Sequence, residues 1–124
     1  MREQPRGEAL LACARRLLRD QVLPALPAER RHALLMSINA MSIAERQLAN
    51  GDQPERQELA ELQGLLDDSK VTLADANRRL AREIRAGRGD PGQAARSAIF
   101  TQLRAQGRRR LAESNPKALP KAAR

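Results

Sequence analysis

Large apolar residues recur along most of this chain at the three- and four-residue spacing of helices that face a core. Residues 33–44 differ, because they carry no charge and their apolar side chains fall on every side of a helix. We therefore expect a central helix that the other helices enclose. With twelve residues, this stretch is too short to cross a bilayer, which needs about 20 apolar residues.

Prolines, glycines and capping residues divide the pattern into five predicted helices. They cover about residues 8–22, 28–50, 54–66, 72–87 and 91–106. Pro24 and Pro27 stop the first helix, so residues 22–27 should cross the end of the bundle in an extended conformation. Gly51 ends the second helix, and Gly107 should break the fifth.

The later helices carry start signals and apolar stripes. Asp52 stands two residues before Pro54 and Asp90 directly before Pro91, and both are expected to cap a helix, as is Thr72 with Asp75 three residues on. The expected core stripes of the third, fourth and fifth helices are Leu59, Leu62 and Leu66, then Leu73, Ala76, Asn77, Leu80 and Ile84, then Ala95, Ile99, Phe100 and Leu103.

Composition supports an all-α fold. The chain has 124 residues with one Phe, no Tyr and no Trp, so residues that favour strands are scarce. The length suits one domain. We predict a single-domain bundle of about five helices around the central second helix, over residues 1–107, followed by a basic, partly disordered tail over residues 108–124.

The net charge of +8 is concentrated near the C-terminus. Residues 101–124 carry seven Lys and Arg against one acid, whereas residues 32–100 carry nine against ten acids. A basic tail attracts polyanions and acidic protein surfaces without specificity. A solvated tail, with Arg108–Arg110 exposed, is the favoured interpretation, and docking to an acidic partner is the second.

The residues offer little catalytic chemistry. His32 is the only histidine and Cys13 the only cysteine. With no second His or Cys, we expect neither a zinc site nor a catalytic Cys-His pair built from the usual ligands. Glu58 and Glu61 are interpreted as exposed charges. We expect a protein that is not an enzyme and that has no catalytic, metal or cofactor-binding residue.

Residues 87–92 match the letters of a G-x-G-x-x-G dinucleotide loop. Such a loop follows a strand and places a helix N-terminus against a pyrophosphate, whereas here a helix precedes it and Asp90 is negatively charged. A joint between two helices is the better interpretation.

Asn39 and Asn77 interrupt apolar stripes. A buried amide without partners costs about 1–3 kcal/mol. We expect a satisfied core network, in which the two asparagines bond to each other or brace a loop; a polar pocket or interface is the alternative.

The order of several segments resembles a family of small bacterial proteins of unknown function. These proteins accompany aminoglycoside-phosphotransferase-like kinases and acyl-CoA dehydrogenases. The matching segments span about residues 5–117. They are residues 8–11, 22–27, 33–46 with Asn39-Ala40-Met41 at the centre, 48–51, Leu73 with Asn77 and Leu80, 84–87, and Asn115-Pro116. The chain departs from the family's pattern at His32, Leu35 and Lys117.

The resemblance implies an accessory role. The best-understood relatives are similar to the small partner of the kinase that phosphorylates 4-hydroxyacyl-CoA intermediates in levulinate-type catabolism. By this analogy the protein would bind and stabilise or activate such a kinase, which itself holds ATP and magnesium. The candidate interface or polar network is Asn39, Arg46, Asn77 and Arg85, because these positions match the family.

Three further expectations concern location and partners. A cytoplasmic protein without a membrane anchor is expected, because charges interrupt the apolar N-terminal stretch. A homodimer through an exposed leucine face is plausible. The alternative function is nucleic-acid binding through the basic C-terminal tail, for which the chain lacks aromatic residues that stack on bases.

Overall fold

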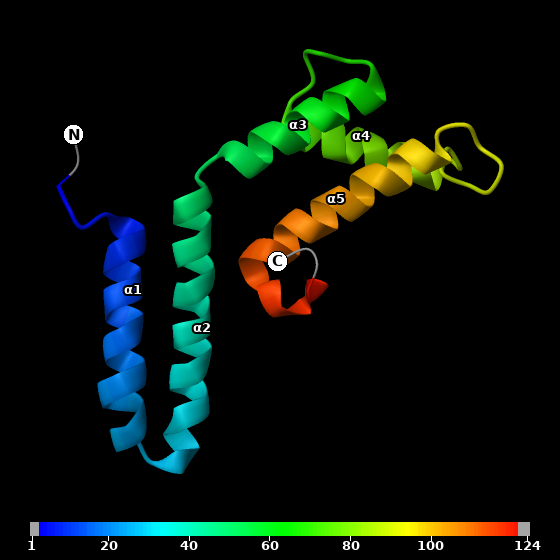
Figure 1. The fold of residues 1–124 in the computed structure, drawn as a ribbon. Helices are drawn as coiled ribbons and strands as arrows, with labels where there is room; N and C mark the ends of the chain where they lie inside the picture. Colours follow the sequence, from blue (N-terminus) through cyan, green and yellow to red (C-terminus); the bar gives the residue numbers. More distant parts are fainter. Residues whose placement is uncertain (1–2, 122–124) are drawn as a thin grey trace. The chain divides into compact units, whose positions relative to one another are not determined.

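The computed structural model describes residues 3–121, and within that range the chain is helical with no strand (Figure 1). The α-helices are α1 (Gly7–Leu17), α2 (Ala28–Asn50), α3 (Gln53–Leu66), α4 (Leu73–Arg85) and α5 (Arg96–Ser114). The all-α class with five helices is confirmed.

The chain forms two compact units. Residues 3–51 together with 113–115 make the hairpin unit, and residues 52–112 together with 116–121 make the three-helix unit. Helix α5 therefore belongs mainly to the three-helix unit, while its last two residues group with the hairpin unit.

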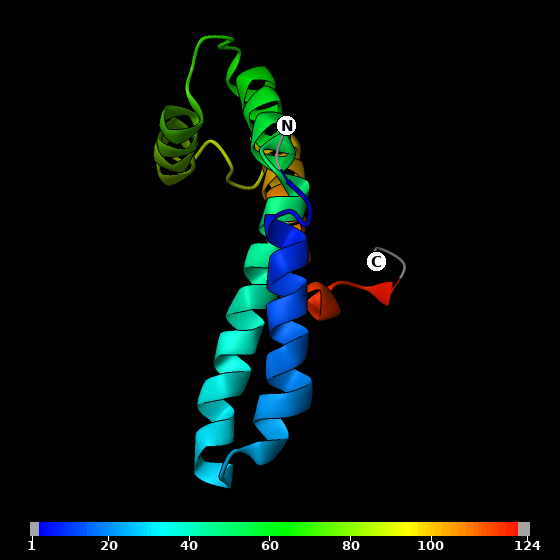
Figure 2. The same cartoon turned by 90° about the vertical axis from the view of Figure 1, so that its left-hand side faces the viewer.

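In the hairpin unit, α1 and α2 run side by side in opposite directions (Figures 1 and 2). Arg15 and Glu45 form an ion pair of 3.1 Å between them. A π-helical turn (Leu18–Val22) and a 3-10 turn (Leu23–Ala25) join the two helices. The prediction of an extended connection was wrong, because Pro24 lies in the first turn of the 3-10 helix, where no backbone N–H is needed.

Helix α2 has the predicted bounds, and Gly51 follows it with φ of 58°. The prediction that residues 33–44 are enclosed on all sides was wrong, since Ile38 is the only residue of this stretch that is buried. Leu34 and Met41, one turn to either side of Ile38, are half-buried. Because a helix pair buries one face of each helix, the remaining apolar side chains of α2 lie outside the hairpin's contact.

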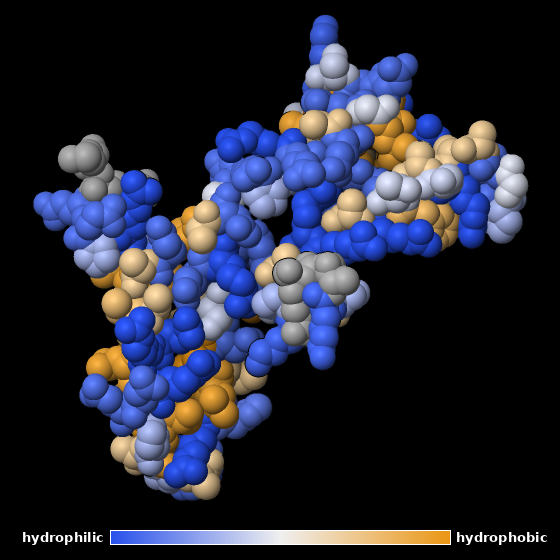
Figure 3. Space-filling view, viewed as in Figure 1, coloured by the Kyte–Doolittle hydropathy of each residue, from blue (hydrophilic) through white to orange (hydrophobic). Residues whose placement is uncertain are grey.

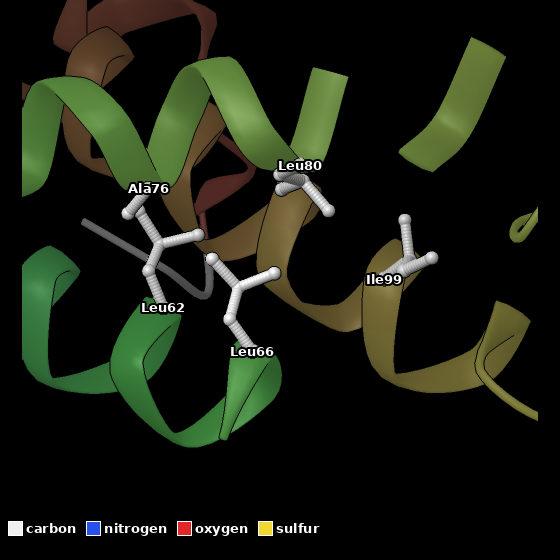
Figure 4. Close-up of a cluster of buried hydrophobic side chains, with 5 residues drawn as sticks. All are labelled: Leu62, Leu66, Ala76, Leu80 and Ile99. Carbon is white, nitrogen blue, oxygen red and sulfur yellow. The ribbon is translucent and has the colours of Figure 1, made fainter. Parts of the chain in front are cut away.

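The three-helix unit contains a closed core (Figure 4). Its buried side chains are Leu62 and Leu66 from α3, Ala76 and Leu80 from α4, and Ile99 from α5. The predicted stripes of the third and fourth helices are confirmed at these positions. In α5 the buried residues are Ile99, Gln102 and Gln106, whereas Phe100 and Leu103, which were predicted to face the core, are exposed.

The helix ends agree with the predictions in part. Thr72 Oγ1 accepts a hydrogen bond of 3.2 Å from the backbone N–H of Asp75, as predicted. Asp52 forms no such side-chain cap, so that prediction was wrong. Helix α5 starts at Arg96 rather than just after Asp90.

Helix α5 also continues through Gly107, which was predicted to break it. A glycine inside a helix costs only about 1 kcal/mol relative to alanine, so it weakens a helix without ending it. Of the predicted tail, residues 108–114 are helical, Pro116–Ala118 form a 3-10 turn, and Leu119 is buried. Residues 122–124 lie outside the described residues. No helix within residues 3–121 has the length and apolarity needed to cross a membrane.

Candidate functional site

The four predicted site residues lie on two helices. Asn39 and Arg46 stand seven residues apart on α2, where Asn39 is exposed and Arg46 is half-buried. Arg46 Nε donates a hydrogen bond to the backbone carbonyl of Glu113. Asn77 and Arg85 are on α4. Arg85 lies in the last turn of this helix and is exposed, whereas Asn77 is half-buried.

Asn77 is the centre of a polar network that joins all three helices of the three-helix unit. Its Nδ2 donates to Glu58 Oε1 on α3 and to the backbone carbonyl of Leu73, both at 3.1 Å. Gln106 Nε2 on α5 donates to Asn77 Oδ1 at 3.2 Å and to the Glu58 carboxylate. The expected satisfied network is therefore present around Asn77, but the expectation that Asn39 belongs to such a core network was wrong, because Asn39 is exposed on α2.

Its two other members, Glu58 and Gln106, were not foreseen. Glu58 was interpreted as an exposed charge, but it is half-buried and accepts bonds from two amides. The available signal was helical spacing. Glu58 precedes the core residue Leu62 by one turn, and Gln106 follows Ile99 by two turns, so both share the face of a core residue.

A second contact between α3 and α5 is the ion pair of Glu61 with Arg109. Arg109 Nη1 and Nη2 donate to the two Glu61 oxygens at 3.0 and 2.6 Å, in a bidentate geometry. The hydrogen bond from Arg109 holds the pKa of Glu61 below its ordinary value, against the opposing effect of burial. The central arginine of the Arg108–Arg110 cluster is thus tied into the fold and is not part of a free tail.

A third polar cluster closes the α3–α4 connection. Arg79 donates to the Leu66 carbonyl at 3.2 Å, to Asp68 at 3.4 Å and to Glu83 at 3.2 Å. Arg88 also donates to Glu83. Burial alone would raise the pKa of Glu83, but the hydrogen bonds from Arg88 and Arg79 outweigh it and lower this pKa. These contacts hold the end of α3 against α4.

The residues that were considered for chemistry lie apart from such networks. His32 and Cys13 are both exposed. Across residues 3–121, no group of three or more His, Cys, Asp or Glu side chains is placed to hold a metal ion. The glycine-rich residues 87–92 connect α4 to α5, with Gly87 and Gly92 at positive φ, so they form a joint between helices as predicted.

The hairpin unit has an exposed apolar surface. Five of its large side chains are 46–56% exposed, and together we call them the hairpin apolar surface: Leu10, Leu17, Leu35, Met36 and Leu48. Apolar atoms are visible over the lower part of this hairpin in Figure 3. Among the described residues of the unit, Ile38 is the only large apolar side chain that is fully buried.

Comparison with known families identifies the chain. A family described as a domain of unknown function (DUF6285) matches residues 24–118. The chain belongs to this family. The part that matches the DUF6285 family includes α2, α3, α4 and α5, with the whole network of Glu58, Asn77 and Gln106, whereas α1 precedes it.

No curated protein matches the chain significantly. No solved structure matches it either.

Proposed function

We propose that this protein is a non-catalytic accessory protein that binds an aminoglycoside-phosphotransferase-like kinase in the cytoplasm and stabilises or activates it. The kinase would act in short-chain hydroxyacyl-CoA catabolism of the levulinate type and would itself bind ATP and magnesium. The choice of partner follows from the resemblance of the sequence segments described above. The DUF6285 family supplies no function of its own to this proposal.

The hairpin apolar surface carries the proposal. Contiguous exposed apolar side chains on soluble proteins mark interaction sites. Full burial of a leucine or methionine side chain contributes about 1.5–3 kcal/mol relative to full exposure, so covering each of these half-exposed side chains would contribute roughly half of that amount. Each helix of the hairpin uses one face against the other, and we expect the partner to cover exposed apolar side chains on the remaining faces.

One of the predicted site residues falls on this surface. Asn39 follows Leu35 by four positions and Met36 by three, and all three are exposed. At this spacing they share one face of α2. Asn39 would therefore give the apolar surface a polar group that fixes the register of a partner helix.

The polar groups named above in the three-helix unit are engaged with one another. Glu58, Asn77 and Gln106 bond to one another, and Glu61 is occupied by Arg109. Groups that are satisfied in this way lend rigidity to a scaffold.

Co-purification tests the proposal. The chain is co-expressed with the phosphotransferase-like kinase of the same genome, and the amount captured by a tag on the kinase is measured. The wild type should be captured in a fixed ratio to the kinase, and the double substitution Leu35→Ser with Met36→Ser should abolish capture.

Leu111→Ser provides the matched control, because Leu111 is also an exposed leucine but lies on α5. This variant should be captured like the wild type. A kinase that does not retain the wild-type chain, or that retains the double variant fully, contradicts the proposal.

A further inference from the structure

Helix α5 and the turn before it have an unusual charge pattern. Between Pro91 and Ala112 the chain has five arginines and no acidic residue. Arg109 is paired with Glu61. Within residues 3–121, Arg96, Arg104 and Arg108 form no ion pair with a carboxylate.

A shallow groove lies along this part of α5. Its volume is about 450 Å³, it is open to solvent, and we call it the α5 groove: it is lined by Gln93, Ala94, Arg96, Ser97, Phe100, Thr101 and Arg104. The Arg96 guanidinium lies 4.4 Å from the centre of the Phe100 ring, and that of Arg104 lies 5.8 Å from it. Arg96 also donates to the Gly89 carbonyl at 2.7 Å, which fixes its position.

We propose that the α5 groove is the docking site for an acidic α-helix of a partner protein. The identification of that partner as the phosphotransferase-like kinase rests on the proposed function. Charge complementarity is the reason for the choice, because the groove presents two arginines without counter-charges and its lining contains no acid.

The spacing of these groups suits a helix. Arg96 and Arg104 are eight residues apart, which is about 12 Å along the axis of α5. Carboxylates two turns apart on a partner helix have the same separation. Phe100 lies between the two arginines in sequence, where an apolar side chain of the partner helix would pack beside it.

The groove favours a protein over a nucleic acid. Single-stranded nucleic acids gain affinity from bases that stack on open aromatic rings. Phe100 is the only aromatic residue of the chain, and both guanidinium groups lie within the cation–π range of about 6 Å from it. Its ring therefore already has cations against it instead of standing open to a base.

A peptide-binding measurement with the full chain tests the groove. The probe is a labelled helical peptide of roughly 18 residues, since shorter isolated helices are marginal in water, with Glu at every fourth position and Leu between. Fluorescence anisotropy at about 0.15 M salt should show binding. Arg104→Glu with Arg108→Glu reverses one arginine of the groove and the arginine one helical turn beyond it on α5. This double variant should weaken binding about tenfold or more, because each reversal replaces an attraction by a repulsion.

The control is a matched double reversal elsewhere in the same unit. Arg56 on α3 and Arg82 on α4 are exposed, and Arg56→Glu with Arg82→Glu changes the net charge by the same amount. This variant should bind the peptide within about twofold of the wild type. A peptide with Lys in place of Glu should bind the Arg104→Glu and Arg108→Glu variant better than it binds the wild type.

Two results overturn the proposal: equal loss of binding in both double variants, or a DNA duplex that binds at the α5 groove where the acidic peptide does not. The same variants in the kinase co-purification separate this inference from the proposed function. If the kinase still captures the Arg104→Glu and Arg108→Glu variant, the result agrees with the proposed function but contradicts the α5 groove as the docking site of the kinase. If the kinase does not capture the wild-type chain, the proposed function is contradicted, and the peptide measurement alone then tests the groove.

Discussion

The two units of this protein use the same kind of helix in different ways. In the three-helix unit, residues such as Leu62 and Ile99 are almost completely buried, and half-buried polar groups bond across helices. In the hairpin unit, the five side chains of the hairpin apolar surface are 46–56% exposed and others such as Leu34 and Met41 are half-buried, while Ile38 is buried.

The difference reflects how many neighbours each helix has within its unit. Two packed helices can cover one face each, whereas three helices enclose a volume from several sides. Helix α2 carries apolar residues on more than one face, but in the hairpin unit its neighbours are the α1 segment, the connecting turns and the short stretch of residues 113–115. We therefore interpret the three-helix unit as the part that supplies stability and the hairpin as the part that supplies a surface.

Loss of a core leucine should give the largest effect. Leu62→Ala should lower the free energy of unfolding of the three-helix unit by about 2–5 kcal/mol, because it removes buried methyl groups and leaves a cavity. Urea denaturation followed by circular dichroism measures this change. Leu17→Ala in the hairpin should cost less than about 1 kcal/mol, since Leu17 is half exposed. Similar losses from both substitutions would remove the contrast between the units.

The two asparagines provide a matched pair for the polar network. Asn77→Ala should cost about 1–3 kcal/mol, because Glu58 and Gln106 each lose a partner in a half-buried site. Asn39→Ala should change stability by less than about 0.5 kcal/mol, because Asn39 is exposed. Thermal unfolding measures both, and a larger loss from the Asn39 variant would be incompatible with the distinction drawn here.

Acid should destabilise the three-helix unit through Glu61. Its pKa is lower in the folded chain, chiefly because Arg109 donates to it, so the unfolded chain binds more protons as the pH falls. The stabilisation is present above the ordinary glutamate pKa of 4.5 and is lost as the pH falls below that value and through the lower folded pKa.

Glu61→Gln and Arg109→Gln should each flatten the dependence of stability on pH in this window, since either change removes the pair. Urea titrations at a series of pH values measure the slope. An unchanged slope in both variants would show that the ion pair does not contribute to acid sensitivity.

The smallest effect concerns the glycine that does not break α5. Gly107 lies inside the helix, and a Cβ added there would meet no neighbouring atom. Gly107→Ala should therefore raise stability by about 0.5–1 kcal/mol. Gly51→Ala should lower it, because Gly51 has φ of 58°. Thermal unfolding distinguishes the two, and a loss of stability from Gly107→Ala would indicate a helix break at that position.

Sequence patterns predicted where the helices lie better than they predicted which helices pack against each other. Caps and breakers placed α2, α3 and α4 within a few residues, and periodicity selected Leu62, Ala76 and Leu80 as core residues. Periodicity shows which faces are apolar but not what covers them. For this reason the apolar faces of α2 were expected to be enclosed, although most of those residues are not buried.

The polar part of the site shows the same limit. The position of Asn77 in an apolar stripe predicted that it would need partners, but its partners lie 19 and 29 residues away in sequence, on other helices. Gln102 and Gln106 were not assigned to the core because they are polar, although both are buried. Long-range pairing of this kind depends on tertiary packing, which local propensity does not encode.

Hydrogen exchange of the full chain, alone and with the kinase, tests the central contrast most directly. In the chain alone, amides of residues 62–66, 76–80 and 99–106 should exchange most slowly, and those of α1 and the first half of α2 much faster, because few of their contacts are buried. Addition of the kinase should slow the hairpin amides. Hairpin amides that are as protected as the three-helix core without any partner, and unchanged by the kinase, would contradict this account.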